Sequence, residues 1–168
     1  MEKNFHYFEK IAPLLLAPAK DIRSLENIDW QALRQSYTQW LKSNGGLFEI
    51  VEHEGLADMV GLCDIKNAFE AYNSSTEQNE EDFYSFVTEK LLDAIMDSGT
   101  GESEDSAIYV VNVFEEYFLL NNVFSCKKTK SQQLVGYNEK SIDIIEFEDV
   151  QGKARKIFFD VTDALAAE

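Results

Sequence analysis

Cysteine, histidine and proline are scarce in this 168-residue chain, with two residues of each. Cys63 and Cys126 form one pair at most and lack zinc-site spacing, so reduced thiols are expected. Glu52-His53-Glu54 has no second histidine to complete a zinc-protease helix, and His53 is predicted to be an exposed helix residue. No metal or cofactor is therefore predicted, and 168 residues are enough to bury a core without one.

Recognisable catalytic motifs are missing as well. No Gly-x-Ser-x-Gly elbow is present, although a catalytic triad assembled from distant residues leaves hydrolysis open. The glycine-rich loop 98–103 precedes a predicted strand instead of opening a helix, and it lacks the lysine of a P-loop. The acidic residues of this region repel an anion, so a helix end followed by a flexible turn is the favoured interpretation.

A long apolar run is also absent. The segment from Ile11 to Ala17 is interrupted by Pro13 and is too short to span a bilayer. The residues from Met1 to His6 lack the basic-then-apolar order of a secretory signal. A cytoplasmic protein is expected.

Basic residues are few: the chain has 15 of them against 31 acidic residues, and its formal net charge is −16. The segment 61–122 holds 14 acidic and 2 basic residues, which is −12 of this total. Such a field repels nucleic acid and anionic membranes and attracts a basic polypeptide. The alternative is a solvated, solubilising surface. Lys127, Lys128 and Lys130 are too few to indicate nucleic-acid binding and are expected in a solvated loop.

The first hundred residues have the apolar spacing of helices. Asp29 is predicted to cap a helix that ends at Asn44-Gly45-Gly46, and Asp64 and Asn79 are predicted to cap two later ones. Helices are expected at 4–16, 29–44, 47–62, from 64 to about 72, and 79–98.

The pattern changes within the segment from Ala107 to Leu120. A β-branched run predicts a buried strand, and helical spacing follows from Phe114 onward. Strands are then expected at 131–137, 141–150 and 153–161, the last two joined as a hairpin around Gln151-Gly152. This order predicts a single α+β domain over residues 1–168, with N-terminal helices packed on one face of a C-terminal, mainly antiparallel sheet.

Several short motifs occur in a fixed order in the C-terminal part. They are Gly99-Thr-Gly-Glu102, Tyr109-Val-Val-Asn-Val113, Glu115-Glu-Tyr117, Ser131-Gln-Gln-Leu134 and Ile157-Phe-Phe-Asp-Val161. In these motifs the chain resembles the bacterial domain-of-unknown-function family numbered 4919, over residues 98–161. The resemblance implies a fold and no activity.

Glu115 and Glu116 are the candidate acid or base residues, because a carboxyl among apolar residues has a raised pKa. Neighbouring helical residues diverge by about 100°. One of the two is therefore expected to cap or pair locally, and the other to be solvated.

The leading hypothesis is a non-enzymatic cytoplasmic immunity-type protein that binds and occludes a basic bacterial toxin, such as one directed at nucleic acid. The alternatives are a small enzyme with a carboxylate between helix and sheet, and an adaptor that inhibits nothing. Acidic residues would supply the attracting field and a tyrosine the anchor. The predicted partner-binding residues are Tyr72, Glu77, Glu80, Glu81, Asp82, Tyr84, Glu102, Glu104 and Asp105.

Overall fold

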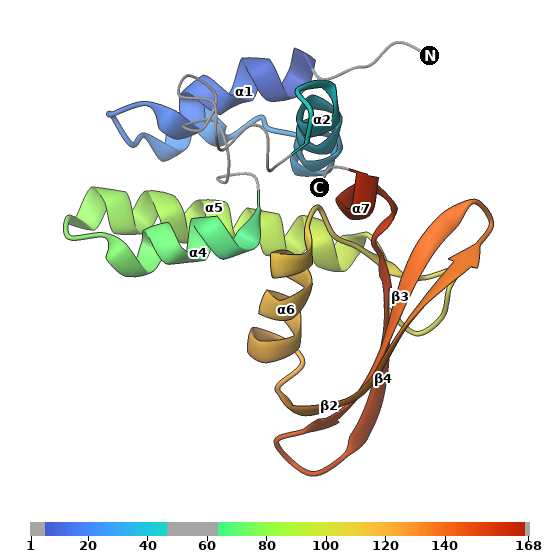
Figure 1. Ribbon diagram of the computed structural model, residues 1–168. Coiled ribbons are helices and arrows are strands. Elements are labelled where there is room, and N and C mark those ends of the chain that lie inside the picture. Colours follow the sequence, from blue (N-terminus) through green and yellow to red (C-terminus); the bar gives the residue numbers. More distant parts are fainter. Residues whose placement is uncertain (1–5, 47–63, 167–168) are drawn as a thin grey trace. The chain divides into compact units, whose positions relative to one another are not determined.

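The computed structural model describes residues 6–46 and 64–166 and has the α+β class predicted from the sequence (Figure 1). Its contacts divide the chain into two compact units, Met1–Ala94 with Ala166–Glu168, and Ile95–Leu165. The prediction of one domain over 1–168 stays a prediction. The helix expected at 47–62 and the residue His53 lie outside the described residues.

The first unit is helical. It contains α1 (His6–Leu16), the short 3-10 helix η1 (Ile22–Leu25), α2 (Trp30–Ser43), α4 (Ile65–Ser74) and most of α5 (Gln78–Asp97). The Asp29 and Asp64 caps are confirmed, because their carboxylates accept from Ala32 N at 3.1 Å and Asn67 N at 2.9 Å. The predicted Asn79 cap is wrong. Helix α5 begins at Gln78, so Asn79 lies in its first turn.

Aromatic side chains form much of this unit's core. The Phe8 ring lies 5.2 Å from that of Tyr37 and 4.8 Å from that of Trp40, and all three side chains are buried. Leu33 and Leu41 lie on the same helix as Tyr37 and are also buried, as the helical spacing predicts. Helix α2 ends at Ser43 with Asn44 as its C-cap, and Gly45 and Gly46 follow with φ values of 91° and 92°.

The second unit is a four-stranded sheet with helix α6. Its elements are β1 (Ile108–Tyr109), α6 (Val113–Asn122), β2 (Cys126–Tyr137), β3 (Lys140–Asp149), β4 (Ala154–Asp160) and the start of α7 (Thr162–Ala166). The strand order is β1-β4-β3-β2, and only the β1–β4 pair is parallel. The predicted change from strand to helix after Ala107 is confirmed. Strand β2 begins five residues before the predicted Ser131.

Side chains alternate between the two faces along each strand, and the register of the strands places large apolar residues on the same face. Ile108 is paired with Phe159 and Ile145 with Ile157, and all four are buried. Phe147, opposite Arg155, continues this row along β3. Leu119 and Leu120 of α6 are also buried, and Figure 1 shows this helix beside the curved sheet.

Within the described part of the chain, no helix combines the length and the apolar character needed to cross a membrane.

Candidate functional site

Six of the nine predicted partner-binding residues lie on the hairpin of α4 and α5 in the helical unit. Tyr72 is on α4, Glu77 directly precedes α5, and the others occupy the first two turns of α5. Glu77 and Asp82 are exposed, whereas Glu80 and Glu81 are partly covered. A helix N-terminus favours carboxylates, so their position also stabilises α5.

The negative charge of this surface is largely uncompensated. Within 64–97 the structure shows one ion pair, between Lys66 and Glu70 at 3.1 Å. Lys90 lies over the Phe86 ring instead of beside a carboxylate. Among the described residues, no cation pairs with Glu77, Glu80, Glu81, Asp82, Glu89 or Asp93.

The two predicted anchor tyrosines are half-buried and already have aromatic neighbours. The Tyr84 ring packs edge-on against Phe83 at 5.4 Å, and Lys20 Nζ lies 5.5 Å from the Tyr84 centroid. Tyr72 lies 6.3 Å from Phe69. Each tyrosine therefore presents only part of its ring to a partner.

The other three predicted residues, Glu102, Glu104 and Asp105, belong to the sheet unit. Glu102 and Asp105 are exposed, and Asp105 Oδ1 accepts a hydrogen bond of 2.7 Å from the Tyr137 hydroxyl. This bond is the largest cause of a raised Tyr137 pKa, followed by burial and the charge of Asp105. The nine residues are thus divided between two separate units.

Glu115 has the predicted local role at the start of α6. Asn112 Oδ1 accepts from Glu115 N at 2.8 Å, and Glu115 Oε1 accepts from Val111 N at 3.2 Å. These reciprocal bonds resemble a capping box, in which one satisfies the first-turn amide of Glu115 and the other the amide of Val111 just before the N-cap. Glu115 is fully buried in this role.

Glu116 is also fully buried, with 0% of its surface exposed, so the prediction of a solvated carboxylate is wrong. Among the described residues, neither of its side-chain oxygens has a partner in hydrogen-bond geometry. Burial raises the Glu116 pKa to about 9, and the nearby Asp143 carboxyl on β3 adds to the shift. Asp143 is 6% exposed and accepts a hydrogen bond of 2.6 Å from Gln132 Nε2.

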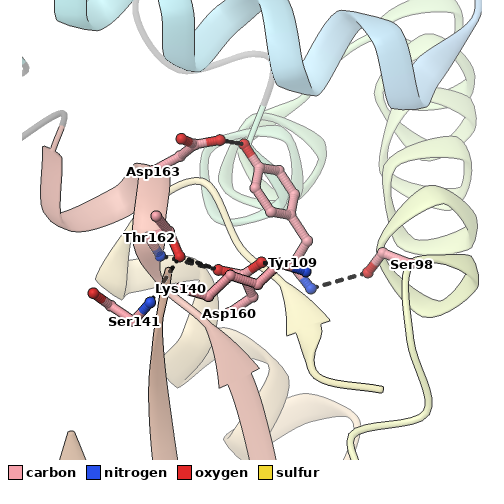
Figure 2. Close-up of polar contacts among 7 residues, drawn as sticks. All are labelled: Ser98, Tyr109, Lys140, Ser141, Asp160, Thr162 and Asp163. Carbon is pink, nitrogen blue, oxygen red and sulfur yellow. Dashed lines mark hydrogen bonds and ion pairs between the residues drawn. The ribbon is translucent and has the colours of Figure 1, made fainter. Parts of the chain in front are cut away.

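A second polar cluster joins the ends of the central strands to α7 (Figure 2). The Tyr109 hydroxyl donates to Asp163 Oδ2 at 2.6 Å, and Tyr109 N donates to Ser98 Oγ at 3.0 Å. Asp160 Oδ1 accepts from both the amide (3.1 Å) and the hydroxyl (2.6 Å) of Thr162. In the same cluster, Ser141 N donates to Thr162 Oγ1 at 2.9 Å, and Lys140 Nζ lies 3.8 Å from Asp160 Oδ2.

Sequence reasoning did not identify this cluster. The Asp160-Val-Thr162 order was the available signal, because an aspartate often accepts hydrogen bonds from the residue two positions later. The long-range partners carry no such signal: Tyr109 and Asp163 are 54 residues apart. The cluster links the end of β4 and the start of α7 to β3 and β1, and it links β1 to Ser98, which directly follows α5.

Replacing Tyr109 by phenylalanine tests what this cluster contributes to stability. Tyr109→Phe removes the short bond to Asp163 and leaves a partly buried carboxylate without that donor. We expect the free energy of unfolding to fall by about 1 kcal/mol, measured by urea denaturation. Tyr137→Phe, which removes an exposed bond to Asp105, is the control and is expected to change stability less. Equal midpoints for Tyr109→Phe and the wild type would show that the Tyr109–Asp163 bond contributes nothing to stability.

In residues 6–46 and 64–166, no group of three or more histidine, cysteine, aspartate or glutamate side chains is placed to hold a metal ion. The half-buried Cys126 forms no disulfide.

Comparison with known proteins gives one match. No curated protein and no solved structure is significantly similar to the chain. The sequence model of a domain of unknown function, DUF4919, matches residues 59–168. The match begins well before Ser98, so it includes α4 and α5 as well as the whole sheet unit. Because this match covers more than half of the sequence, the chain belongs to the DUF4919 family.

Proposed function

We propose that the protein binds a basic polypeptide through the acidic surface of α4 and α5. In its most specific form, the proposal is a cytoplasmic, non-enzymatic immunity-type protein that occludes a basic toxin, such as one directed at nucleic acid. The observation that carries the proposal is the set of six carboxylates on and beside α5 without a cationic partner in the described structure.

Electrostatics supports a basic partner. Unpaired carboxylates on one helix hairpin leave a local negative field, which accelerates the diffusional encounter with a positive surface and is screened by salt. The same field opposes binding to nucleic acid or to an anionic membrane. A toxin that binds nucleic acid needs a basic surface of its own, and an acidic protein that covers this surface blocks the toxin.

Affinity after the encounter requires more than charge, because exposed ion pairs contribute little. Tyr84 and Tyr72 are the aromatic groups beside the acidic residues, and the exposed part of each ring is available to a partner. Interfaces concentrate their binding energy in such aromatic residues. Tyr84→Ala is therefore expected to accelerate dissociation, whereas charge changes act mainly on association.

Charge reversal of Glu80, Glu81 and Asp82 to lysine tests the acidic surface. The partner is first isolated from lysate of the native host with the tagged chain, under washes of increasing salt, and tested for toxicity with and without this protein. At low salt we expect the triple variant to associate roughly tenfold more slowly or worse, with a flatter salt dependence.

The control variant reverses Glu9, Glu26 and Glu139, three exposed residues outside the proposed surface. It carries the same change in net charge and should associate at nearly the wild-type rate. Equal slowing of association in both variants would show that the overall charge of the protein controls the association rate and that α5 is not the binding site. A partner that binds without losing its activity would indicate an adaptor.

One observation favours a second candidate function, an enzyme that uses Glu116 as a general acid. A carboxyl with a pKa of about 9 is protonated at neutral pH. In the described conformation this group is fully buried, so a substrate reaches it only if α6 or the sheet moves. A turnover abolished by Glu116→Gln in a folded protein would support this candidate.

A further inference from the structure

Strand β2 is the last strand in the order β1-β4-β3-β2. Among the described residues it pairs with β3 on one side only, which leaves its other backbone edge open. With 12 residues it is the longest strand in the described structure, and residues 127–134 are all exposed. An exposed sheet edge of this length is a template for pairing with another extended chain.

The two halves of β2 differ in how this edge is protected. The first half contains two register shifts, between Cys126 and Lys128 and between Thr129 and Ser131, and it carries three lysines. Bulges and edge lysines discourage strand pairing. From Gln132 to Tyr137 the register with β3 is continuous, and no residue is charged. Only this second half is a regular, unprotected edge.

The hairpin turn determines which backbone groups face outward. Strands β2 and β3 are joined by the two-residue turn Asn138-Glu139, so Tyr137 and Lys140 form a hydrogen-bonded pair. Counting back in steps of two, Val135 and Gln133 also bond to β3. The amide and carbonyl groups of Gln132, Leu134 and Gly136 therefore point to the open edge. Leu134 is 58% exposed, which provides an apolar contact there.

The first half of β2 has positive charge that other residues do not neutralise. Among the described residues, Lys127, Lys128 and Lys130 have no ion pair or hydrogen bond through their side chains. Lys130 also lines a shallow pocket of about 340 Å³ with Arg155 and Lys156.

The neighbouring carboxylates leave part of this charge available. Lys156 pairs with Glu146 at 3.7 Å, and Glu148 lies opposite Lys128 across the ladder. The Arg155 guanidinium lies over the rings of Phe124 and Phe147, 5.5 and 5.9 Å from their centroids, and forms no ion pair with a described carboxylate. Lys127 and Lys130, both exposed, thus present positive charge at one end of the β2 edge, in a chain whose net charge is −16.

We propose that β2 binds an extended acidic peptide segment as a fifth strand of the sheet. The segment pairs its backbone with the outward groups of Gln132, Leu134 and Gly136 and packs an apolar side chain on Leu134. Its acidic residues continue past the register shifts to Lys127, Lys128 and Lys130. Charge complementarity identifies this occupant, and the surface is distinct from the acidic one of the proposed function.

The experiment measures binding of fluorescein-labelled synthetic peptides to the full chain by fluorescence anisotropy. Two probes join four glutamates to Thr-Val-Thr-Val-Thr-Val, one with the glutamates at the N-terminus and one with them at the C-terminus. They suit parallel and antiparallel addition to β2, respectively. Control peptides carry lysines in place of the glutamates. We expect one glutamate peptide to bind, with an affinity that falls as salt rises, and the lysine peptides not to bind.

Two variants locate the binding. Leu134→Pro removes an outward N–H while leaving the ladder to β3 intact, because proline is tolerated where the N–H of an edge strand faces solvent. Replacing Lys127, Lys128 and Lys130 by alanine removes the charge and leaves the backbone unchanged. Each change is expected to weaken binding by roughly tenfold. The matched control replaces Lys10, Lys66 and Lys90, three lysines of the helical unit, and should bind like the wild type.

Three results would overturn the proposal. The first is that no glutamate peptide binds, or that the lysine peptides bind equally. The second is that the triple alanine variant binds like the wild type, a comparison that holds even if Leu134→Pro does not fold. The third is sedimentation of the wild type as a dimer that the triple alanine variant retains and Leu134→Pro loses, which would assign the edge to a second copy of the chain.

Discussion

Replacing Glu116 by glutamine is expected to stabilise the protein at neutral pH, by about 3 kcal/mol at pH 7. The carboxyl is buried beside Asp143, and its pKa rises from 4.5 to about 9 on folding. In the unfolded chain it ionises freely at pH 7, so folding must take up a proton. Glutamine has nearly the same shape and no such cost, and its amide is able to donate to Asp143.

The effect has a defined pH dependence. Between about 4.5 and 9 the folded state holds one more proton at this position than the unfolded state, so wild-type stability falls as pH rises. Below pH 4.5 both states are protonated, and the wild type and Glu116→Gln should be almost equally stable. The difference in the free energy of unfolding should grow with pH and level off above 9. Urea denaturation of both proteins from pH 4 to 9 measures it.

Glu115→Gln is the matched control, one residue earlier on the same helix. Glu115 caps α6 by accepting from Val111 N, and a carboxylate at a helix N-terminus is favourable. This variant should lower stability, by up to about 1 kcal/mol, which is the opposite sign. If Glu116→Gln also lowered stability at pH 7, the carboxyl would have a favourable partner in the folded protein, and the raised pKa would be incorrect.

Gly99→Ala is expected to destabilise the sheet unit by roughly 2–3 kcal/mol. A Cβ at this position would overlap the backbone oxygens of Ser106 and Ala107 and lie 2.9 Å from the Ala107 carbonyl carbon. These atoms cannot rotate away as the end of a side chain can, so the loop 98–107 must move. That loop also provides Gly101 O, which accepts from Phe158 N at 3.0 Å, and Ser98 Oγ, which accepts from Tyr109 N.

Gly136→Ala is the control for this substitution. No atom lies within 4 Å of a Cβ built at Gly136, which sits on the open edge of β2. The stability of Gly136→Ala should equal that of the wild type or be slightly higher, because alanine restricts the conformations of the unfolded chain. Both variants are compared by urea denaturation monitored by circular dichroism. Equal midpoints for the two would mean that the approach of Gly99 to residues 106–107 does not constrain the fold.

Local sequence signals predicted most of the elements correctly. Asp29 and Asp64 cap helices because a short acidic side chain reaches the amides of its own first turn, which depends on neighbouring residues alone. The change from strand to helix after Ala107 is equally local, since it follows from side-chain periodicity. The start of α5 was misplaced by two residues, because the predicted cap was Asn79 and the residue directly before the helix is Glu77, as is common where several polar residues compete to cap the same helix.

Side-chain environments were predicted less well because they depend on distant residues. Adjacent helical residues diverge by about 100°, and this suggested that one of Glu115 and Glu116 is solvated. The structure instead buries both, Glu115 in the cap and Glu116 near Asp143 on β3. Lys127, Lys128 and Lys130 lie on β2 and not in the predicted loop, although they are solvated as predicted.

The amino-acid sequence by itself determined the α+β class, the helical first part and strand-rich last part of the chain, the caps at Asp29 and Asp64, and the concentration of negative charge in the middle of the chain. These properties follow from composition, periodicity and the chemistry of near neighbours. Only the tertiary structure decided that Glu116 is buried beside Asp143, that Tyr109 reaches Asp163, and that β2 forms an open edge. Each of these depends on contacts between residues far apart in the chain, and no local pattern encodes which strand lies at the edge of a sheet.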